Sequence, residues 1–227
     1  MQEEQKAGAP ERLGAFTCNT CGAQNVSTAD AVERERPTCS CCHSSIRFRS
    51  VALPLSRALF GLDLKLPDFP LLKTVRGLGF SDSETYSGVL ADRFSYTNTF
   101  YHRVPRFDLL QPDETEFGKY DFVICSDVLE HVPDPIDRAF GTLGGLLKPT
   151  GVLILTVPYS LEPGVIEHYP DLAGSTFAEI DGRTVLVCRS TTVSIASSAG
   201  RAFLHALKSS RWLRLRRIFG VGPDLGR

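Results

Sequence analysis

With 227 residues, of which 42% are hydrophobic and 22% charged, the chain is long enough for one well-packed domain and a small accessory module. Its formal net charge of −1 argues against a protein that coats nucleic acid through bulk charge, and no apolar segment is long enough to span a bilayer. The polar, acidic start, MQEEQKAGAPERLG, does not follow the pattern of a signal peptide, so a cytoplasmic location is expected.

Shifts in composition divide the chain into five segments. They are a flexible N-terminus (1–15), a cysteine-rich module (16–50), a linker (51–73), an α/β domain (74–190) and a basic tail (191–227). Within the linker, Leu53–Phe60 is typical of a short helix.

The cysteine-rich module holds five of the seven cysteines, four of them in two C-x-x-C pairs. Two thiolates on one tight turn reach adjacent corners of a tetrahedron around Zn²⁺, and a second pair closes the site. Because clustered cysteines in a reducing compartment favour metal over disulfides, we predict a structural zinc ribbon, with free thiols or a disulfide pair as the alternative. Cys41 and His43 are spare candidates for the fourth ligand, and Gly22 suits the bend after the first pair. Arg47–Arg49, which follow the ribbon, predict a solvated basic strand edge, with contact to an anionic partner as the alternative. The predicted zinc ligands are Cys18, Cys21, Cys39 and Cys42.

From residue 74 the sequence alternates strand and helix patterns. The elements predicted in chain order are a strand over Thr74–Phe80, a helix over Glu84–Phe94, a strand over Tyr96–Tyr101 and a short strand over Phe107–Leu109. The first strand enters the glycine-rich turn Gly77-Leu78-Gly79, where a backbone without side chains lets a ligand approach closely.

A buried strand, a helix and a second buried strand follow in Tyr120–Ser160. Tyr120–Cys125 and Val152–Val157 are short apolar runs, and two prolines fix the start of a helix that continues to Leu147. These alternating elements predict an α/β fold with a doubly wound, Rossmann-like and mostly parallel sheet. Such sheets bind ligands at the carboxyl ends of their strands.

The C-terminal part combines a predicted hairpin with a basic tail. Phe177–Ile180 and Arg183–Cys188 flank an Asp-Gly pair, which favours a two-residue type I′ turn. Arg201–Phe219 is typical of a basic amphipathic helix, which contacts an anionic partner such as lipid or RNA. The alternative is a terminal helix packed on the sheet.

The sequence pattern of Tyr120–Ser160 closely resembles that of the class I S-adenosylmethionine (SAM)-dependent methyltransferases of type 11/12. It consists of D-V-L-E-H-V-P-D-P, a helix and L-K-P-T-G. Over about residues 16–190 the chain is similar to bacterial methyltransferase-like proteins that carry an N-terminal zinc ribbon and are often linked to sugar or cell-surface metabolism. The resemblance implies SAM as the cofactor and a small molecule or a sugar as the methyl acceptor.

By motif position, the resemblance also implies a SAM site at the carboxyl edge of the sheet. Asp108 corresponds to the carboxylate that accepts the adenine amino group, with a turn-capping aspartate as the alternative. Two acids of the family are absent, one where Val75 stands and one at the end of the second strand, for which Asn98 or Tyr101 is a weaker, neutral substitute. The implied cofactor-binding residues are Gly77, Gly79, Ser81, Asp108, Ser126, Asp127, Val128 and Leu129.

Methyl transfer is an in-line displacement, in which an enzyme positions the nucleophile and, for a hydroxyl acceptor, takes a proton. His131 is the candidate base because imidazole titrates near neutrality, and orientation of its loop is the alternative role. Tyr159, His168 and Tyr169 follow the fifth strand and are candidate acceptor-binding residues. Two rival functions stay open: a degenerate methyltransferase fold that binds without turnover, favoured by the missing acids, and an RNA methyltransferase whose ribbon and tail hold RNA.

Overall fold

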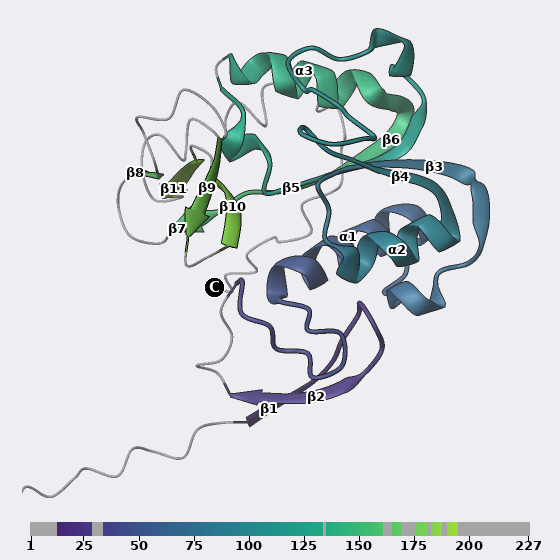
Figure 1. Ribbon diagram of the computed structural model, residues 1–227. Helices are drawn as coiled ribbons and strands as arrows, with labels where there is room; N and C mark the ends of the chain where they lie inside the picture. The colour runs from purple at the N-terminus through teal and green to yellow at the C-terminus, as the bar shows by residue number, and fades with distance from the viewer. Residues whose placement is uncertain are drawn as a thin grey trace, which may run out of the picture. The chain divides into compact units, whose positions relative to one another are not determined.

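The structure is a computed structural model, and it describes residues 13–28, 34–133, 135–160, 165–168, 176–180, 183–187 and 190–194 (Figure 1). The chain forms two compact units. Unit 1 comprises the residues up to Leu71 together with Ser83–Arg93, and unit 2 comprises Leu72–Asp82 and the residues from Phe94 onward. The predicted tail helix, Arg201–Phe219, lies outside the described residues. Among the described helices, none combines the length and the apolar character that crossing a bilayer requires.

Unit 1 begins with a hairpin and two cysteine turns. Strands β1 (Leu13–Thr17) and β2 (Gln24–Thr28) pair antiparallel around the first C-x-x-C turn. The second turn precedes helix α1 (Ile46–Phe60). This helix ends where Gly61 adopts a left-handed conformation, with φ of 67°, and donates its N–H to the carbonyl of Arg57.

Helix α1 is longer than the predicted helix and begins at Ile46. Arg47 and Arg49 therefore lie in its first turns, and the prediction of a basic strand edge at this point is wrong. Arg47 forms an ion pair with Glu35 at 2.9 Å, and Arg49 donates to the carbonyl of Ser44 at 2.7 Å. Both guanidinium groups thus have partners within unit 1.

Helix α2 (Glu84–Arg93) completes unit 1 and lies beside α1. The rings of Phe48 in α1 and Tyr86 in α2 are 5.9 Å apart. Arg93 donates a hydrogen bond to a carbonyl of the short 3-10 helix η2 (Leu66–Asp68) at 2.8 Å. The helix predicted from the sequence is confirmed, apart from its last residue, which begins the next strand.

Unit 2 contains the predicted parallel sheet. Its elements are β3 (Leu72–Phe80), β4 (Phe94–Thr99), β5 (Tyr120–Ser126), α3 (Ile136–Leu146) and β6 (Leu147–Thr156). The four strands run in the order β4–β3–β5–β6, and every neighbouring pair is parallel. Along the chain, α2 joins β3 to β4 and α3 joins β5 to β6. This arrangement is a Rossmann-like α/β fold, so the predicted fold class is confirmed.

Helix α3 covers one face of this sheet (Figure 1). On that face, alternate residues of β3 and β5 meet the buried side of α3, as the two-residue period of a strand requires. The core residues of this face include Leu78, Phe80, Val123, Cys125, Ala139, Leu143 and Leu146. The other face carries an aromatic cluster, in which the rings of Phe94 and Tyr96 lie 5.4 and 5.9 Å from the ring of Phe122.

Two predicted segments differ from the structure. Phe107–Leu109 is not a strand, because the segment forms a turn in which Asp108 accepts a hydrogen bond from the N–H of Leu110 at 2.8 Å. In the described chain between β4 and β5, the helical structure is limited to the 3-10 helix η3 (Glu114–Glu116). Lys148–Gly151, predicted as a loop after α3, belongs to β6, whose pairing with β5 contains a register shift.

The described residues beyond β6 form two small sheets. The strands are β7 (Tyr159–Ser160), β8 (Val165–His168), β9 (Thr176–Ile180), β10 (Arg183–Val187) and β11 (Ser190–Ser194). The antiparallel pair β9–β10 confirms the predicted hairpin. β11 pairs with β7 on one side and β8 on the other, and it contacts the 3-10 helix η4 (Leu129–His131) that follows β5.

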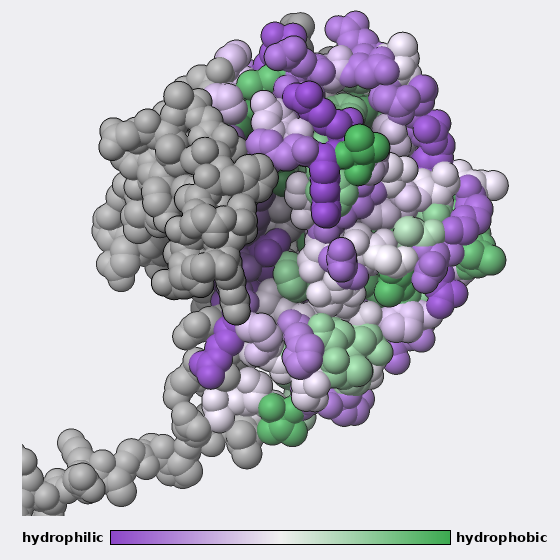
Figure 2. Space-filling view, viewed as in Figure 1, coloured by the Kyte–Doolittle hydropathy of each residue, from purple (hydrophilic) through white to green (hydrophobic). Residues whose placement is uncertain are grey.

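On the face drawn in Figure 2, the hydrophobic side chains of the described residues appear as separate spots among polar ones. Two of the exposed large hydrophobic residues, Tyr101 at 50% and Val104 at 88% exposure, lie in the loop that follows β4. This loop leaves the sheet at the carboxyl end of its strands.

Candidate functional site

The carboxyl edge of the sheet carries two residues in a strained backbone conformation. Ser81 follows β3 and Asp127 follows β5, and both have left-handed φ angles, of 56° and 55°. Because β3 and β5 are neighbours, these turns lie side by side at the edge where open α/β sheets bind ligands. A left-handed conformation costs a non-glycine residue about 1 kcal/mol or more, and such strain gathers at functional sites.

The two glycines of the predicted turn are required by packing within unit 2. A Cβ atom on Gly77 would lie 2.1 Å from the ring of Phe122. A Cβ atom on Gly79 would lie 2.0 Å from the Tyr96 hydroxyl and 2.1 Å from Oδ2 of Asp82. Protein atoms therefore fill the space above both α-carbons, which the sequence pattern reserves for a ligand. Contact of Gly77 and Gly79 with SAM stays a prediction.

A hydrogen-bonded group, not predicted from the sequence, joins the ends of β3 and β4. The Tyr96 hydroxyl donates to Oδ2 of Asp82. The Asn98 side chain accepts from the N–H of Asp82 at 2.9 Å and donates to the Asp82 carbonyl at 2.8 Å. Thr99 Oγ1 donates to the carbonyl of Gly79 at 2.7 Å. Both polar groups of Asn98 are thus engaged in fixing the turn, which argues against its expected role as a substitute for the ribose-binding acid.

The end of β5 is fixed to the end of β6 in a similar way. Oγ of Ser126 and Oγ1 of Thr156 are 2.8 Å apart, and Thr156 Oγ1 donates to Oδ1 of Asp127 at 2.9 Å. The N–H of Asp127 donates to the Thr156 carbonyl at 3.0 Å. Val128 is half-buried, and the side chain of Leu129 packs into the core at 3% exposure, so it points away from a ligand at this edge.

His131 lies at the end of η4, and its side chain is 37% exposed. Its Nε2 is 3.9 Å from Oε1 of Glu130, whose side chain is 5% exposed. Because β11 contacts η4 and pairs with β7 and β8, the backbone segments that carry Tyr159 and His168 lie near the same end of the sheet. The side chains of these two residues, and all of Tyr169, lie outside the described part of the chain.

Asp108 caps a turn at this edge. Its Oδ1 accepts from the N–H of Leu110 at 2.8 Å, and its carbonyl accepts from the N–H of Gln111 at 3.2 Å. The ring of the preceding Phe107 packs on Phe80, the last residue of β3, at 5.4 Å. The capping role weighed as the alternative is therefore present, and adenine binding by Asp108 stays a prediction.

Three carboxylates lie close to the buried thiol of Cys125. Burial raises the pKa of the Cys125 thiol well above its usual range. Three nearby acids raise this pKa further, namely Glu130, Asp82 and Asp127. All three acids follow strands at the carboxyl edge of the sheet, where they favour a cationic ligand in their ionised form.

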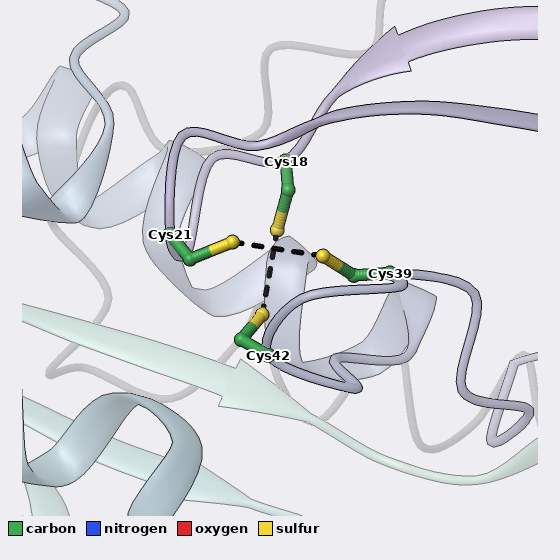
Figure 3. Close-up of side chains that lie close together, drawn as sticks. All are labelled: Cys18, Cys21, Cys39 and Cys42. Carbon is green, nitrogen blue, oxygen red and sulfur yellow. Dashed lines mark hydrogen bonds between the residues drawn. The ribbon is translucent and has the colours of Figure 1, made fainter.

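The four predicted zinc ligands converge in unit 1 (Figure 3). The Sγ atoms of Cys18, Cys21, Cys39 and Cys42 all lie within 4.8 Å of one another. Those of Cys18 and Cys42 are 3.7 Å apart, and those of Cys21 and Cys39 are 3.6 Å apart. A sulfur tetrahedron around Zn²⁺, with Zn–S distances of about 2.3 Å, has edges of about 3.8 Å, so the cluster fits this ion. Cys41 is exposed and lies outside the cluster.

The two cysteine turns have the same construction. In each, the residue after the second cysteine has a left-handed φ, of 85° at Gly22 and 55° at His43. These residues donate their N–H groups to the carbonyl of the first cysteine, at 2.7 and 3.1 Å. Asn25 braces both turns, because its side chain donates to the Ala23 carbonyl at 2.9 Å and to Sγ of Cys39 at 3.6 Å. His43 thus shapes a turn and is not part of the cluster.

Hydrogen bonds favour the thiolate form of two cluster residues. Burial acts to raise the pKa of Cys39, but the N–H groups of Cys42 and Cys41 donate to its sulfur and the pKa falls to about 6. Burial likewise opposes ionisation of Cys18, yet its pKa is lowered, chiefly by a hydrogen bond with Ser44. Burial raises the pKa of the other two thiols. Stabilised thiolates are the form in which cysteine binds metal.

Comparison with solved structures finds a likeness to the 1,6-didemethyltoxoflavin-N1-methyltransferase of Burkholderia thailandensis, solved with 1,6-didemethyltoxoflavin and S-adenosylhomocysteine bound. The TM-score is 0.39 at 13% sequence identity over 71% of this chain, which spans 65% of the length of that protein. No curated protein matches the chain. A family model described as a methyltransferase domain matches residues 71–185, half of the chain, which therefore belongs to this methyltransferase-domain family.

Proposed function

We propose that this chain is a class I SAM-dependent methyltransferase that transfers a methyl group to a small-molecule or sugar acceptor. Its family supports the reaction class. The observation that carries the site is the pair of left-handed turns at Ser81 and Asp127, at the ends of adjacent strands. Their N–H groups donate to the carbonyls of Thr99 and Thr156, at 2.7 and 3.0 Å. Because these hydrogen bonds fix both turns, the edge offers a rigid surface for a ligand that lies across the ends of β3 and β5.

The charge of this edge suits SAM in particular. SAM carries a positive sulfonium, and Asp82, Asp127 and Glu130 give the edge a negative field. S-adenosylhomocysteine lacks that positive charge and should therefore bind more weakly than SAM. Apart from Leu129, whose side chain packs into the core, the predicted cofactor residues keep their place in this proposal, and the Asp82–Tyr96 pair supports the turn that carries them.

For a hydroxyl acceptor, a group of this chain must take a proton, and we assign this role to His131. The partly exposed imidazole follows the end of β5, where an acceptor would meet the cofactor. The Glu130 carboxylate, 3.9 Å from Nε2, would stabilise the protonated imidazole. SAM, when bound, supplies the methyl group. Tyr159, His168 and Tyr169 remain the proposed acceptor-binding residues.

We assign one structural Zn²⁺ to the cysteine cluster of unit 1. Four thiolates complete a tetrahedral coordination sphere and leave no position for a reacting molecule. The metal would join the β1–β2 hairpin to the second cysteine turn, in a module too small to fold on apolar burial alone.

One observation favours a second candidate, a binding protein without turnover. No acid stands at the end of β4, in Thr99–His102, and the Asn98 side chain is occupied by the backbone of Asp82. An RNA methyltransferase is less well supported, because Arg47 and Arg49 beside the ribbon have partners within unit 1.

Calorimetric titration with SAM and S-adenosylhomocysteine tests the cofactor, and transfer of labelled methyl to sugars, small metabolites and RNA tests the reaction. Asp127→Ala should weaken SAM binding by about tenfold or more, because a charge and a fixed turn are lost together. Asp92→Ala, at an exposed acid of α2, is the control and should bind as wild type does. A wild-type protein that does not bind SAM would refute the proposal. Binding without any transfer would favour the second candidate.

A further inference from the structure

The loop that follows β4 is a fixed structure at the carboxyl edge of the sheet. At its base, the N–H of Phe100 donates to the Pro105 carbonyl at 2.8 Å, and the N–H of Phe107 donates to the Phe100 carbonyl at 2.9 Å. The ring of Phe107 packs on Phe80 at the end of β3. The loop is thus anchored in the same unit, and at the same edge, as the proposed cofactor site.

The charged groups of this loop are all positive. Residues 101–106 are exposed and contain a histidine and two arginines but no acid. Among the described residues, no carboxylate lies within ion-pair distance of Arg103 or Arg106, whereas Arg47 and Arg57 each have one. Cationic groups without a counter-charge at a ligand-binding edge point to an anionic ligand.

Each arginine is stacked on an aromatic ring of the same loop. The guanidinium carbon of Arg103 is 3.7 Å from the ring centroid of Phe100, and that of Arg106 is 5.4 Å from the ring centroid of Tyr101. The ring of His102 meets Tyr101 edge-on, with centroids 4.7 Å apart. A guanidinium with one face over a ring keeps the N–H groups on its rim for hydrogen bonds, and stacking reduces the side-chain freedom lost on binding.

We propose that residues 100–106, the cation–aromatic loop, bind a phosphoryl group of the methyl acceptor. For the sugar acceptor of the proposed function, this means a phosphorylated or nucleotide-linked sugar. This inference rests on the proposed methyl transfer and names its substrate class. Two arginines match the charge of a phosphate or diphosphate better than that of a single carboxylate. Arginine forks also bind phosphate oxygens in a bidentate manner.

The topology sets the reach that such an acceptor needs. β3 separates β4 from β5, and neighbouring strands lie about 4.8 Å apart, so the base of the loop is about 10 Å from the end of β5. An acceptor held by its phosphoryl group on the loop would extend its sugar toward Asp127 and His131. RNA would need a longer basic surface than one loop with two arginines, and the chain carries a net charge of −1.

The test is calorimetric titration of the full chain with inorganic pyrophosphate at low salt, with malonate as the dicarboxylate comparison. R103Q and R106Q should each weaken pyrophosphate binding by about tenfold or more, because each removes charge-assisted hydrogen bonds. R103K should lie between wild type and R103Q, because lysine keeps the charge but not the fork. R36Q removes an exposed arginine of unit 1 and should bind as wild type does. Malonate should bind at least about tenfold more weakly than pyrophosphate.

Failure to bind pyrophosphate, or equal binding by wild type and both glutamine variants, would overturn the inference, as would malonate binding as tightly as pyrophosphate. A short single-stranded RNA that binds more tightly than pyrophosphate, and depends on both arginines, would assign the loop to nucleic acid instead. SAM titration of R103Q separates this inference from the proposed function, because SAM affinity should not change. A wild type that binds pyrophosphate but not SAM would refute methyl transfer and uphold the anion site. Glucose 1-phosphate and UDP-glucose then distinguish the two acceptor classes by relative affinity.

Discussion

The hydroxyl of Tyr96 donates a hydrogen bond to the carboxylate of Asp82, directly above the α-carbon of Gly79. Tyr96 belongs to β4 and Asp82 to the turn after β3, so this bond ties the glycine turn to the neighbouring strand. The two residues are 9% and 5% exposed. A buried carboxylate without partners is strongly unfavourable, so the bond stabilises the turn on which the proposed cofactor site depends.

Replacing Gly79 with alanine should lower the free energy of unfolding by about 2–4 kcal/mol. The new Cβ would overlap the Tyr96 hydroxyl and the Asp82 carboxylate and would force the pair apart. Gly141 in α3 is the matched control, because a Cβ there meets nothing within 4 Å and alanine favours a helix by up to about 1 kcal/mol. Urea unfolding measures both variants, and equal stability of the two would contradict this account of the turn.

The parallel sheet could be predicted because buried strands form continuous apolar runs, and the sequence locates β5 to within one residue at its end. The short strand predicted over Phe107–Leu109 is wrong, because three residues are too few to show the two-residue period of a strand. The Asp108 side chain favours a turn instead. The predicted start of α1, at Leu53, is also wrong. Proline is typical of the first turn of a helix, but Pro54 lies inside α1, which begins at Ile46.

The cysteine cluster and the carboxyl edge of the sheet differ in whether neighbouring or distant residues of the sequence form them. Each C-x-x-C pair lies on one turn, so the cysteine cluster follows from short-range spacing. The Asp82–Tyr96 pair joins residues fourteen positions apart, which meet only through the parallel register that places Gly79 opposite Asn98. Thr156, which fixes Asp127, is likewise set by the pairing of β5 with β6. The register between two distant strands cannot be predicted from the residue pattern of either strand alone.

Protein purified without added metal should contain about one Zn²⁺ per chain by elemental analysis. Cys39→Ser removes one of the four thiolates, so the variant should lose most of the metal and unfold the β1–β2 hairpin, because metal binding supplies much of the folding free energy of so small a module. Cys41→Ser is the matched control and should keep its metal, since Cys41 is exposed and outside the cluster. A wild-type protein that contains no zinc and whose cluster thiols react freely would refute the assignment of a structural Zn²⁺.

Asp121 should stabilise the chain at neutral pH and lose this effect in acid. Burial alone would raise the pKa of its carboxyl, but hydrogen bonds from the Arg76 N–H at 2.8 Å and the Lys148 ammonium at 2.7 Å outweigh burial and lower the pKa. A lowered folded-state pKa means that the stabilisation is complete above the unfolded-state pKa, about 3.9, and is lost as the pH falls through the folded-state value. Asp121→Asn should therefore reduce the unfolding free energy by about 1–2 kcal/mol at pH 7, and by less as the pH falls below about 4. Chemical unfolding across this range measures the difference, with the exposed Asp92→Asn as control, and a loss independent of pH would contradict the pairing.

His131→Ala should lower turnover by about a hundredfold while changing SAM affinity less than about twofold, because general-base catalysis contributes on the order of 10²–10⁴ to rate. The imidazole is partly exposed beyond β5 and has Glu130 at 3.9 Å, so it is placed to take a proton from an acceptor rather than to hold the cofactor. Labelled-methyl transfer and calorimetry on the same variants separate these effects. If binding and turnover fall in equal proportion, His131 only orients its loop, and the proton must be taken by another group or by water.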